Sequence, residues 1–99
     1  MSYTITEKIL SAHTSQKNIS PGEFILADVD LSLGNDITAP LAIGEFKRMG
    51  FKKVFNNKKI ALIPDHFTPA KDIKSANQVK ILQDFAREQG IVHYYEVGR

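Results

Sequence analysis

The sequence contains no cysteine and no tryptophan among its 99 residues. Without cysteine, the chain cannot form a disulfide scaffold, a thiolate zinc site or a cysteine nucleophile, and it cannot itself hold an iron–sulfur centre. A strong charge is missing as well, because 13 basic residues against 11 acidic ones leave a net charge of +2. That charge is too small to indicate a polyanionic partner.

Long apolar runs and targeting signals are also absent. No window approaches the roughly 20 apolar residues that a membrane span needs. The N-terminus lacks the basic-then-apolar layout of a secretory signal. We therefore expect a cytoplasmic chain without a membrane partner. With 99 residues it has room for one small domain, and no linker or repeat indicates an internal boundary between residues 1 and 99.

Helix-like and strand-like patterns alternate along the chain. Capping residues, apolar spacing and terminal glycines predict three helices, over residues 4–13, 38–50 and 68–90. Alternating or β-rich runs predict three strands, over residues 24–33, 60–63 and 91–97. The expected fold class is α/β, with a mostly parallel sheet and flanking helices. Such a small sheet has open edges, so we expect the chain to be the start of a larger α/β/α domain.

Local signals place two of the helix starts and one turn. Thr4 and Glu7 predict a capping box, in which Thr4 bonds an early backbone N–H and Glu7 reaches back to the cap. Either Thr38 or Ala39 is expected to cap the second helix, and Pro40 lies near its first helical position. Gly34–Asp36 is expected to close the first strand as a turn, since Gly and Asn tolerate the left-handed backbone.

The adjacent pair Asp65 and His66 follows directly on the short apolar strand predicted at residues 60–63. In open α/β sheets, ligands and catalytic groups collect at the carboxyl ends of strands. A carboxylate beside an imidazole raises its proton affinity and orients it, which suits a group that protonates a departing oxygen. The alternative is an Asp that caps the following turn beside a surface His.

The segment Gly34–Thr38 is a second candidate site. It also follows a predicted strand and opens a helix, so parallel strands would place it on the same rim as Asp65 and His66. Amide and hydroxyl groups beside a helix N-terminus suit a carboxylate-bearing ligand. The alternative is a well-formed turn and helix cap without a ligand.

Six basic residues lie between Glu45 and Asp65 with no acid among them: Lys47, Arg48, Lys52, Lys53, Lys58 and Lys59. Phe51 and Phe55 are interleaved with them, as in a nucleic-acid patch. The same phenylalanines would equally anchor a solvated loop to the core, and the small net charge favours that interpretation. The two other histidines, His13 and His93, have no metal-ligand spacing, and phosphate-loop, dinucleotide and hydrolase-elbow motifs are missing.

Three blocks in succession, Val29–Ile43, Lys58–Ala76 and Phe85–Arg99, closely resemble the N-terminal region of the aconitase superfamily. The block PDHFTP is highly specific, and GNDITAP is nearly so. The most similar branch is formed by the large subunits of 3-isopropylmalate dehydratases and their homoaconitase-type relatives. The resemblance runs in order over essentially the whole chain.

This resemblance implies a hydro-lyase that isomerises a hydroxy di- or tricarboxylic acid by dehydration and rehydration. In the family, a 4Fe–4S cluster binds the substrate hydroxyl and carboxylate as a Lewis acid. The positions of Asp65 and His66 imply a pair that protonates the leaving hydroxyl. The position of Asn35 implies a substrate-contacting amide, where aconitases proper have Gln. Thr38 is carried over only as local architecture.

The family's cluster cysteines and its other substrate-binding residues have no counterpart in this chain. Its swivelling domain, in this branch, is a separate small subunit that carries a serine base. We therefore expect an N-terminal fragment of the large subunit, which alone binds no cluster and is inactive. The expected activity of the parent is the conversion of 2-isopropylmalate to 3-isopropylmalate in leucine biosynthesis.

Two alternatives stay open. Within the enzyme class, the parent is a homoaconitase or a methylmalate- or dimethylmalate-type dehydratase, because the residues that select among these acids are not present. Outside that class, the chain is a non-catalytic α/β module that binds an anion, a nucleic acid or a protein partner through its Lys-rich loop, residues 51–59. The dehydratase hypothesis includes no nucleic-acid partner.

Overall fold

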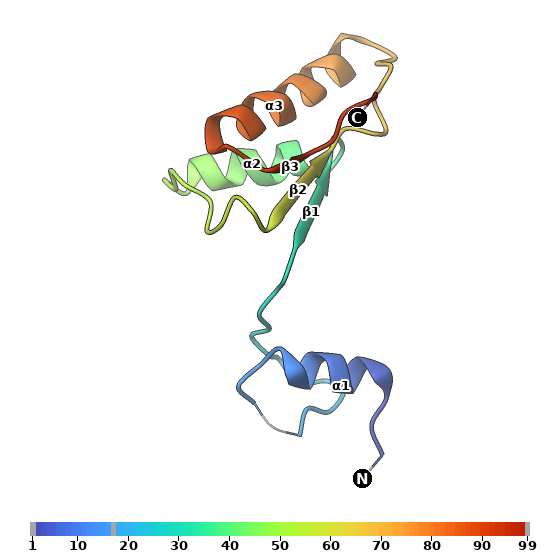
Figure 1. Ribbon diagram of the computed structural model, residues 1–99, viewed down its shortest axis with the longest axis vertical. Helices are drawn as coiled ribbons and strands as arrows, with labels where there is room; N and C mark the ends of the chain where they lie inside the picture. The colour runs from blue at the N-terminus through green and yellow to red at the C-terminus, as the bar shows by residue number, and fades with distance from the viewer. Residues whose placement is uncertain (1, 17, 99) are drawn as a thin grey trace. The chain divides into compact units, whose positions relative to one another are not determined.

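The computed structural model describes residues 2–16 and 18–98, and its contacts divide the chain into two compact units, Met1–Asp30 and Leu31–Arg99. The first unit contains the helix α1, and the second contains a small sheet with the helices α2 and α3 (Figure 1). The prediction of one domain over residues 1–99 stays a prediction, because two compact units do not by themselves define separate domains.

The helix α1 (Ile5–Ala12) begins where the sequence predicts, at the N-cap Thr4. The Thr4 hydroxyl accepts the backbone N–H of Glu7 at 3.1 Å. The second half of the predicted capping box is different, because the Glu7 carboxylate accepts a hydrogen bond from the Thr4 hydroxyl. At the other end, the His13 ring bonds the Ile9 carbonyl and the Asp30 carboxylate, and both contacts raise the pKa of His13.

The predicted strand over residues 24–33 is wrong for most of its length. Phe24 and Leu26 are 99% and 92% exposed, and among the described residues no strand pairs with residues 24–31. A strand requires a neighbour that shares its backbone hydrogen bonds. The neighbouring strand begins at Ile60, which is opposite Ser32. Pairing therefore begins at Ser32 and not at Phe24.

The second unit contains β1 (Ser32–Asn35), α2 (Ala39–Arg48), β2 (Ile60–Ile63), α3 (Ile73–Gln89) and β3 (His93–Tyr94). All strand pairs are parallel, in the order β1–β2–β3. The helices α2 and α3 contact each other and lie beside the sheet (Figure 1). The prediction of an α/β fold with a parallel sheet and flanking helices is confirmed.

The core of the second unit lies between the sheet and the two helices. Leu82 of α3 is fully buried at its centre, and the rings of Phe46 and Phe85 meet edge to face with centroids 5.5 Å apart. Gly34 of β1 makes the close packing of α2 possible. A Cβ at residue 34 would lie 2.9 Å from the Cβ of Ala39, which is closer than side chains tolerate.

Three predicted boundaries are corrected by the structure. Helix α3 begins at Ile73 instead of Thr68–Pro69, because the Asp72 carboxylate accepts the Ser75 backbone N–H at 2.7 Å, whereas the Thr68 hydroxyl donates to a loop carbonyl. The last strand is only His93–Tyr94, since β2 offers it two pairing positions. The turn predicted at Gly34–Asp36 begins later, because Gly34 and Asn35 still pair with β2.

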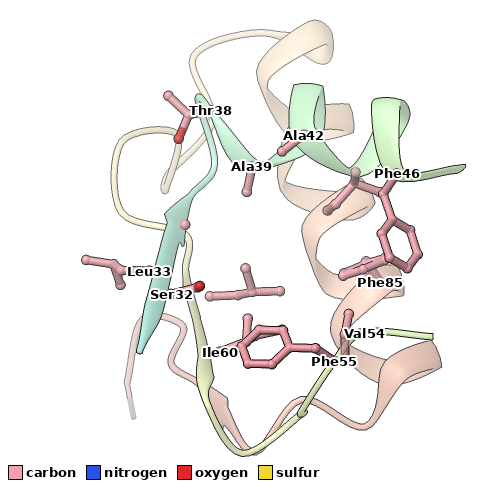
Figure 2. A pocket seen from close by; sticks show the side chains of 13 residues that line it. Ser32, Leu33, Thr38, Ala39, Ala42, Phe46, Val54, Phe55, Ile60 and Phe85 are labelled. Atoms are coloured by element: carbon pink, nitrogen blue, oxygen red, sulfur yellow. The ribbon is translucent and has the colours of Figure 1, made fainter. Parts of the chain in front are cut away.

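An apolar hollow of about 360 Å³ opens beside β1, β2 and α2 (Figure 2). Aromatic and aliphatic side chains line it, among them Phe46, Val54, Phe55, Ile60 and Phe85. Gly34 and Thr38 of the second candidate segment also line this hollow, whereas Asn35, Asp65 and His66 do not. In the described ranges, no helix has the length and apolar character needed to cross a membrane.

Candidate active site

The carboxyl ends of β1 and β2 adjoin, because the last residues of these strands, Asn35 and Ile63, are opposite each other in the parallel register. The loop that leads into α2 and the loop that contains Asp65 and His66 therefore leave the sheet from neighbouring strand ends. This arrangement confirms the prediction that the two candidate segments share one rim. Loops of this kind form the usual ligand crevice of an open α/β sheet.

Asp65 and His66 form a direct pair on this rim. The Asp65 carboxylate lies 2.7 Å from the Nδ1 atom of His66, and both side chains are about half exposed, at 51% and 50%. The hydrogen bond that His66 donates to Asp65, together with the negative charge of Asp65, raises the pKa of His66. The same hydrogen bond lowers the pKa of the Asp65 carboxyl. The pair thus favours an ionised carboxylate beside a protonated imidazole.

The geometry of the pair leaves the second ring nitrogen of His66, Nε2, available to a ligand. With Nδ1–H donated to Asp65, the Nε2 atom of His66 has no hydrogen-bond partner in the part of the chain that the structure describes. A raised pKa keeps a proton on Nε2 over a wider pH range. The arrangement can therefore present an acidic N–H to a ligand oxygen.

Asn35 contributes an oriented amide to the same rim. Its Oδ1 accepts the backbone N–H groups of Ile37 and Thr38, both at 3.0 Å, and the Thr38 hydroxyl at 3.1 Å. These three donors fix the orientation of the amide, and its NH₂ group has no acceptor among the described side chains and backbone atoms. Asn35 thus combines the predicted turn architecture with an NH₂ donor that can serve a ligand oxygen.

Asp36 joins the two loops and was not singled out from the sequence. Its side chain is 0% exposed, and its two carboxylate oxygens accept the backbone N–H groups of His66 and Phe67 at 3.2 and 2.8 Å. Its Oδ1 also lies 3.9 Å from His66 Nδ1. Only an acid in a turn after a strand was visible in the sequence, which gives no sign of a contact 30 residues away.

These residues do not fit an iron–sulfur cluster. Asp36, Asp65 and His66 place one ligand atom each within 4.8 Å of one another, but the groups are carboxylates and an imidazole. Such clusters are held by cysteine thiolates, and the chain has no cysteine. The oxygens of Asp36 are also engaged by backbone N–H groups. Any cluster ligands must therefore come from outside these 99 residues.

The Lys-rich loop is anchored to α3 and is separate from the rim. Gln89 accepts the backbone N–H of Val54 at 3.0 Å and donates to the Lys52 carbonyl at 2.9 Å. Phe51 packs against Phe46, with ring centroids 5.7 Å apart. These contacts favour the interpretation of a solvated loop that its aromatic residues attach to the core.

Comparison with curated proteins gives one consistent result. The chain is 68% identical over 99 residues to the 3-isopropylmalate dehydratase large subunit of Moorella thermoacetica. The matched region is 100% of this chain and 24% of that protein. It is 64% identical over 98 residues to the subunit of the same name from Syntrophus aciditrophicus, covering 99% of this chain and 23% of that protein. No protein-family model matches the chain.

A third relative, the 3-isopropylmalate dehydratase large subunit of Thermodesulfovibrio yellowstonii, is 58% identical over the whole chain. The resemblance predicted from the sequence blocks is therefore confirmed. The chain spans about a quarter of the length of the curated relatives that it matches.

Proposed function

We propose that this chain forms the N-terminal part of the large subunit of a 3-isopropylmalate dehydratase. The parent enzyme would be a hydro-lyase of the aconitase family that converts 2-isopropylmalate to 3-isopropylmalate in leucine biosynthesis, in the cytoplasm. The observation that carries this proposal is the Asp65–His66 pair, which lies on a strand-end rim in a chain 68% identical to such a subunit. A 4Fe–4S cluster and the small subunit would be supplied by the rest of the assembly.

Dehydration breaks a carbon–oxygen bond, and the departing oxygen needs a proton to leave as water. The Nε2–H of His66 is suited to give that proton, because Asp65 holds Nδ1 at 2.7 Å and raises the pKa of His66. The proton on the neighbouring carbon goes to a base that these residues do not provide. In rehydration the same imidazole takes the proton back from the attacking water.

Asn35 is suited to bind a carboxylate of the hydroxy acid. Its Oδ1 is occupied by Ile37 and Thr38, so its NH₂ group is the part that faces a ligand. A neutral donor held in one orientation positions the substrate without competing for the proton on His66. Asn35 and His66 would thus act on different oxygens of one substrate.

The test is a chimera in which this chain replaces the matching quarter of the Moorella thermoacetica large subunit. Assembled with the rest of that enzyme, the chimera is expected to dehydrate 2-isopropylmalate, measured by the absorbance of the unsaturated intermediate. The isolated 99-residue chain is expected to be inactive. A correctly assembled chimera without turnover, or turnover by the isolated chain, would contradict the proposal.

The non-enzymatic alternative can be tested separately, by nucleic-acid binding. A nucleic-acid module would bind with a salt-dependent affinity that disappears when Lys52, Lys53, Lys58 and Lys59 become Ala. We expect no such binding, because Phe51 and Gln89 anchor this loop to the core and the net charge is only +2. Salt-dependent RNA or DNA binding that the four substitutions abolish would favour the alternative.

A further inference from the structure

Asp36 is an acid in a place where acids are rarely stable. Its side chain is 0% exposed, and among the described residues Ser75 is the other buried polar residue of this unit. A buried carboxylate requires hydrogen-bond donors, because its loss of hydration is otherwise uncompensated. The donors here are two backbone N–H groups, of His66 and Phe67, and both belong to the neighbouring loop.

These contacts act on the same histidine that carries the proposed chemistry. Asp36 Oδ1 accepts the backbone N–H of His66 at 3.2 Å, which fixes the peptide from which the imidazole projects. The same oxygen lies 3.9 Å from Nδ1 of the ring, while Asp65 bonds Nδ1 at 2.7 Å. Asp65 is half exposed and can rotate toward water, whereas Asp36 is held on both oxygens.

Asp36 is also the direct neighbour of Asn35 in the chain. One residue thus fixes the distance between the two loops that carry the proposed proton donor and the proposed amide donor. A displacement of about 1 Å between such groups can cost about 100-fold in rate. The contact therefore bears on catalysis although Asp36 has no exposed surface to touch a substrate.

We propose that Asp36 is a positioning residue, which holds the backbone and ring of His66 on the rim and sets its place relative to Asn35. This proposal rests on the proposed function for its catalytic consequence, but its structural part concerns only the described residues. Asp36 and Asp65 are the charged groups that act on the His66 ring in this structure. Asp36→Asn therefore keeps the size of the side chain but removes its charge and one of its two acceptor oxygens.

The first test uses NMR on the 99-residue chain and needs no activity. Asp36→Asn has the size of Asp but no charge, and it places an NH₂ group against a backbone N–H. We expect it to lower the pKa of His66 and to speed amide exchange at His66 and Phe67. Asp36→Glu should keep the pKa raised. Asp84→Asn, which removes an exposed carboxylate on α3, is the matched control and should change neither quantity.

The second test uses the chimera. Asp36→Asn should lower kcat by about 10–100-fold, the range for groups that orient a catalytic ligand, and should change KM little. The pH at which activity falls on the alkaline side should also move down. If the chimera itself is inactive, the proposed function fails, while the NMR result still decides the role of Asp36.

A folded Asp36→Asn chain in which the His66 pKa and both amides are unchanged would overturn the proposal. Where Asp36→Asn does not fold, amide exchange in the unsubstituted chain decides. Slow amide exchange at His66 and Phe67 supports the two hydrogen bonds to Asp36. Exchange as fast as in exposed loops overturns the proposal.

Discussion

The side-chain oxygen of Asn35 accepts both the backbone N–H and the hydroxyl of Thr38, at 3.0 and 3.1 Å. Thr38 is the N-cap of α2, yet its own side chain makes no capping hydrogen bond. Asn35 therefore fixes the turn that leads into α2, from the end of the preceding strand. Its amide nitrogen is left for a ligand.

Two substitutions separate the structural and ligand-binding roles of Asn35. Asn35→Asp keeps the acceptor oxygen but removes the NH₂ donor, so the chimera should show a raised KM with little loss of stability. Asn35→Ala removes all three accepted hydrogen bonds and should also cost about 0.5–1.5 kcal/mol, the net range for a typical intramolecular hydrogen bond, because all three are exposed. Substrate kinetics and urea unfolding measure the two effects. Equal KM values for Asn35→Asp and the unsubstituted chimera would contradict the ligand-binding role.

The Asp65–His66 pair predicts a specific pH dependence. Because Asp65 raises the pKa of His66, the protonated imidazole persists to higher pH and is lost as pH rises through that pKa. Activity that needs the protonated form should fall on the alkaline side. Asp65→Asn removes the carboxylate and should move this fall to lower pH, measured as kcat/KM against pH in the chimera. An unchanged profile would separate Asp65 from the titration of His66.

Parts of the fold could be predicted from the local sequence because contacts between residues close in the chain determine them. The apolar run that ends at Pro64 predicted β2 with its observed bounds, and Thr38 before Pro40 predicted the start of α2. Gly90, with a positive φ of 63°, ends α3 as expected. Each of these features depends on backbone geometry within a few residues.

The remaining features depend on partners that are distant in sequence. Residues 24–33 begin with four apolar residues and then alternate, which is typical of a strand, but pairing begins only at Ser32, where β2 provides a neighbour. The rim position of Asp65 and His66 followed from parallel strands, whereas the role of Asp36 required the fold. An isolated acid in a turn carries no signal of the loop that it binds 30 residues later.

Leu82 lies at the centre of the core and tests its packing. It is 0% exposed, so Leu82→Ala removes buried methyl groups and leaves a cavity in the cluster around Phe85. We expect a loss of about 2–5 kcal/mol in the free energy of unfolding, measured with urea. Ile73→Ala is the control on the same helix, because Ile73 is 81% exposed, and it should change stability by less than about 0.5 kcal/mol. Similar losses at both positions would be inconsistent with the observed core.

Acid should weaken the start of α3. The backbone N–H and the hydroxyl of Ser75 and the nearby Lys71 lower the pKa of Asp72 to about 2. In the unfolded chain this carboxyl has a pKa of about 3.9. Because the folded value is the lower one, the stabilisation is present above about pH 4 and is lost as pH falls toward 2.

Asp72→Asn retains a capping oxygen but does not titrate, so its midpoint of thermal unfolding should depend less on pH in this range. Circular dichroism at 222 nm between pH 5 and 2 provides the measurement. Parallel pH curves for the two chains would show that Asp72 does not contribute to the acid dependence.

The most direct test of the account is the turnover of 2-isopropylmalate by the chimera with His66→Ala, compared with His93→Ala. His66 lies on the rim with Asp65, whereas His93 lies in β3, where its ring contacts Tyr95. We expect His66→Ala to lower kcat by about 10²–10⁴-fold with unchanged cluster content, while His93→Ala retains turnover. Turnover with His66→Ala equal to that of the unsubstituted chimera would contradict the assignment of His66 as the proton donor.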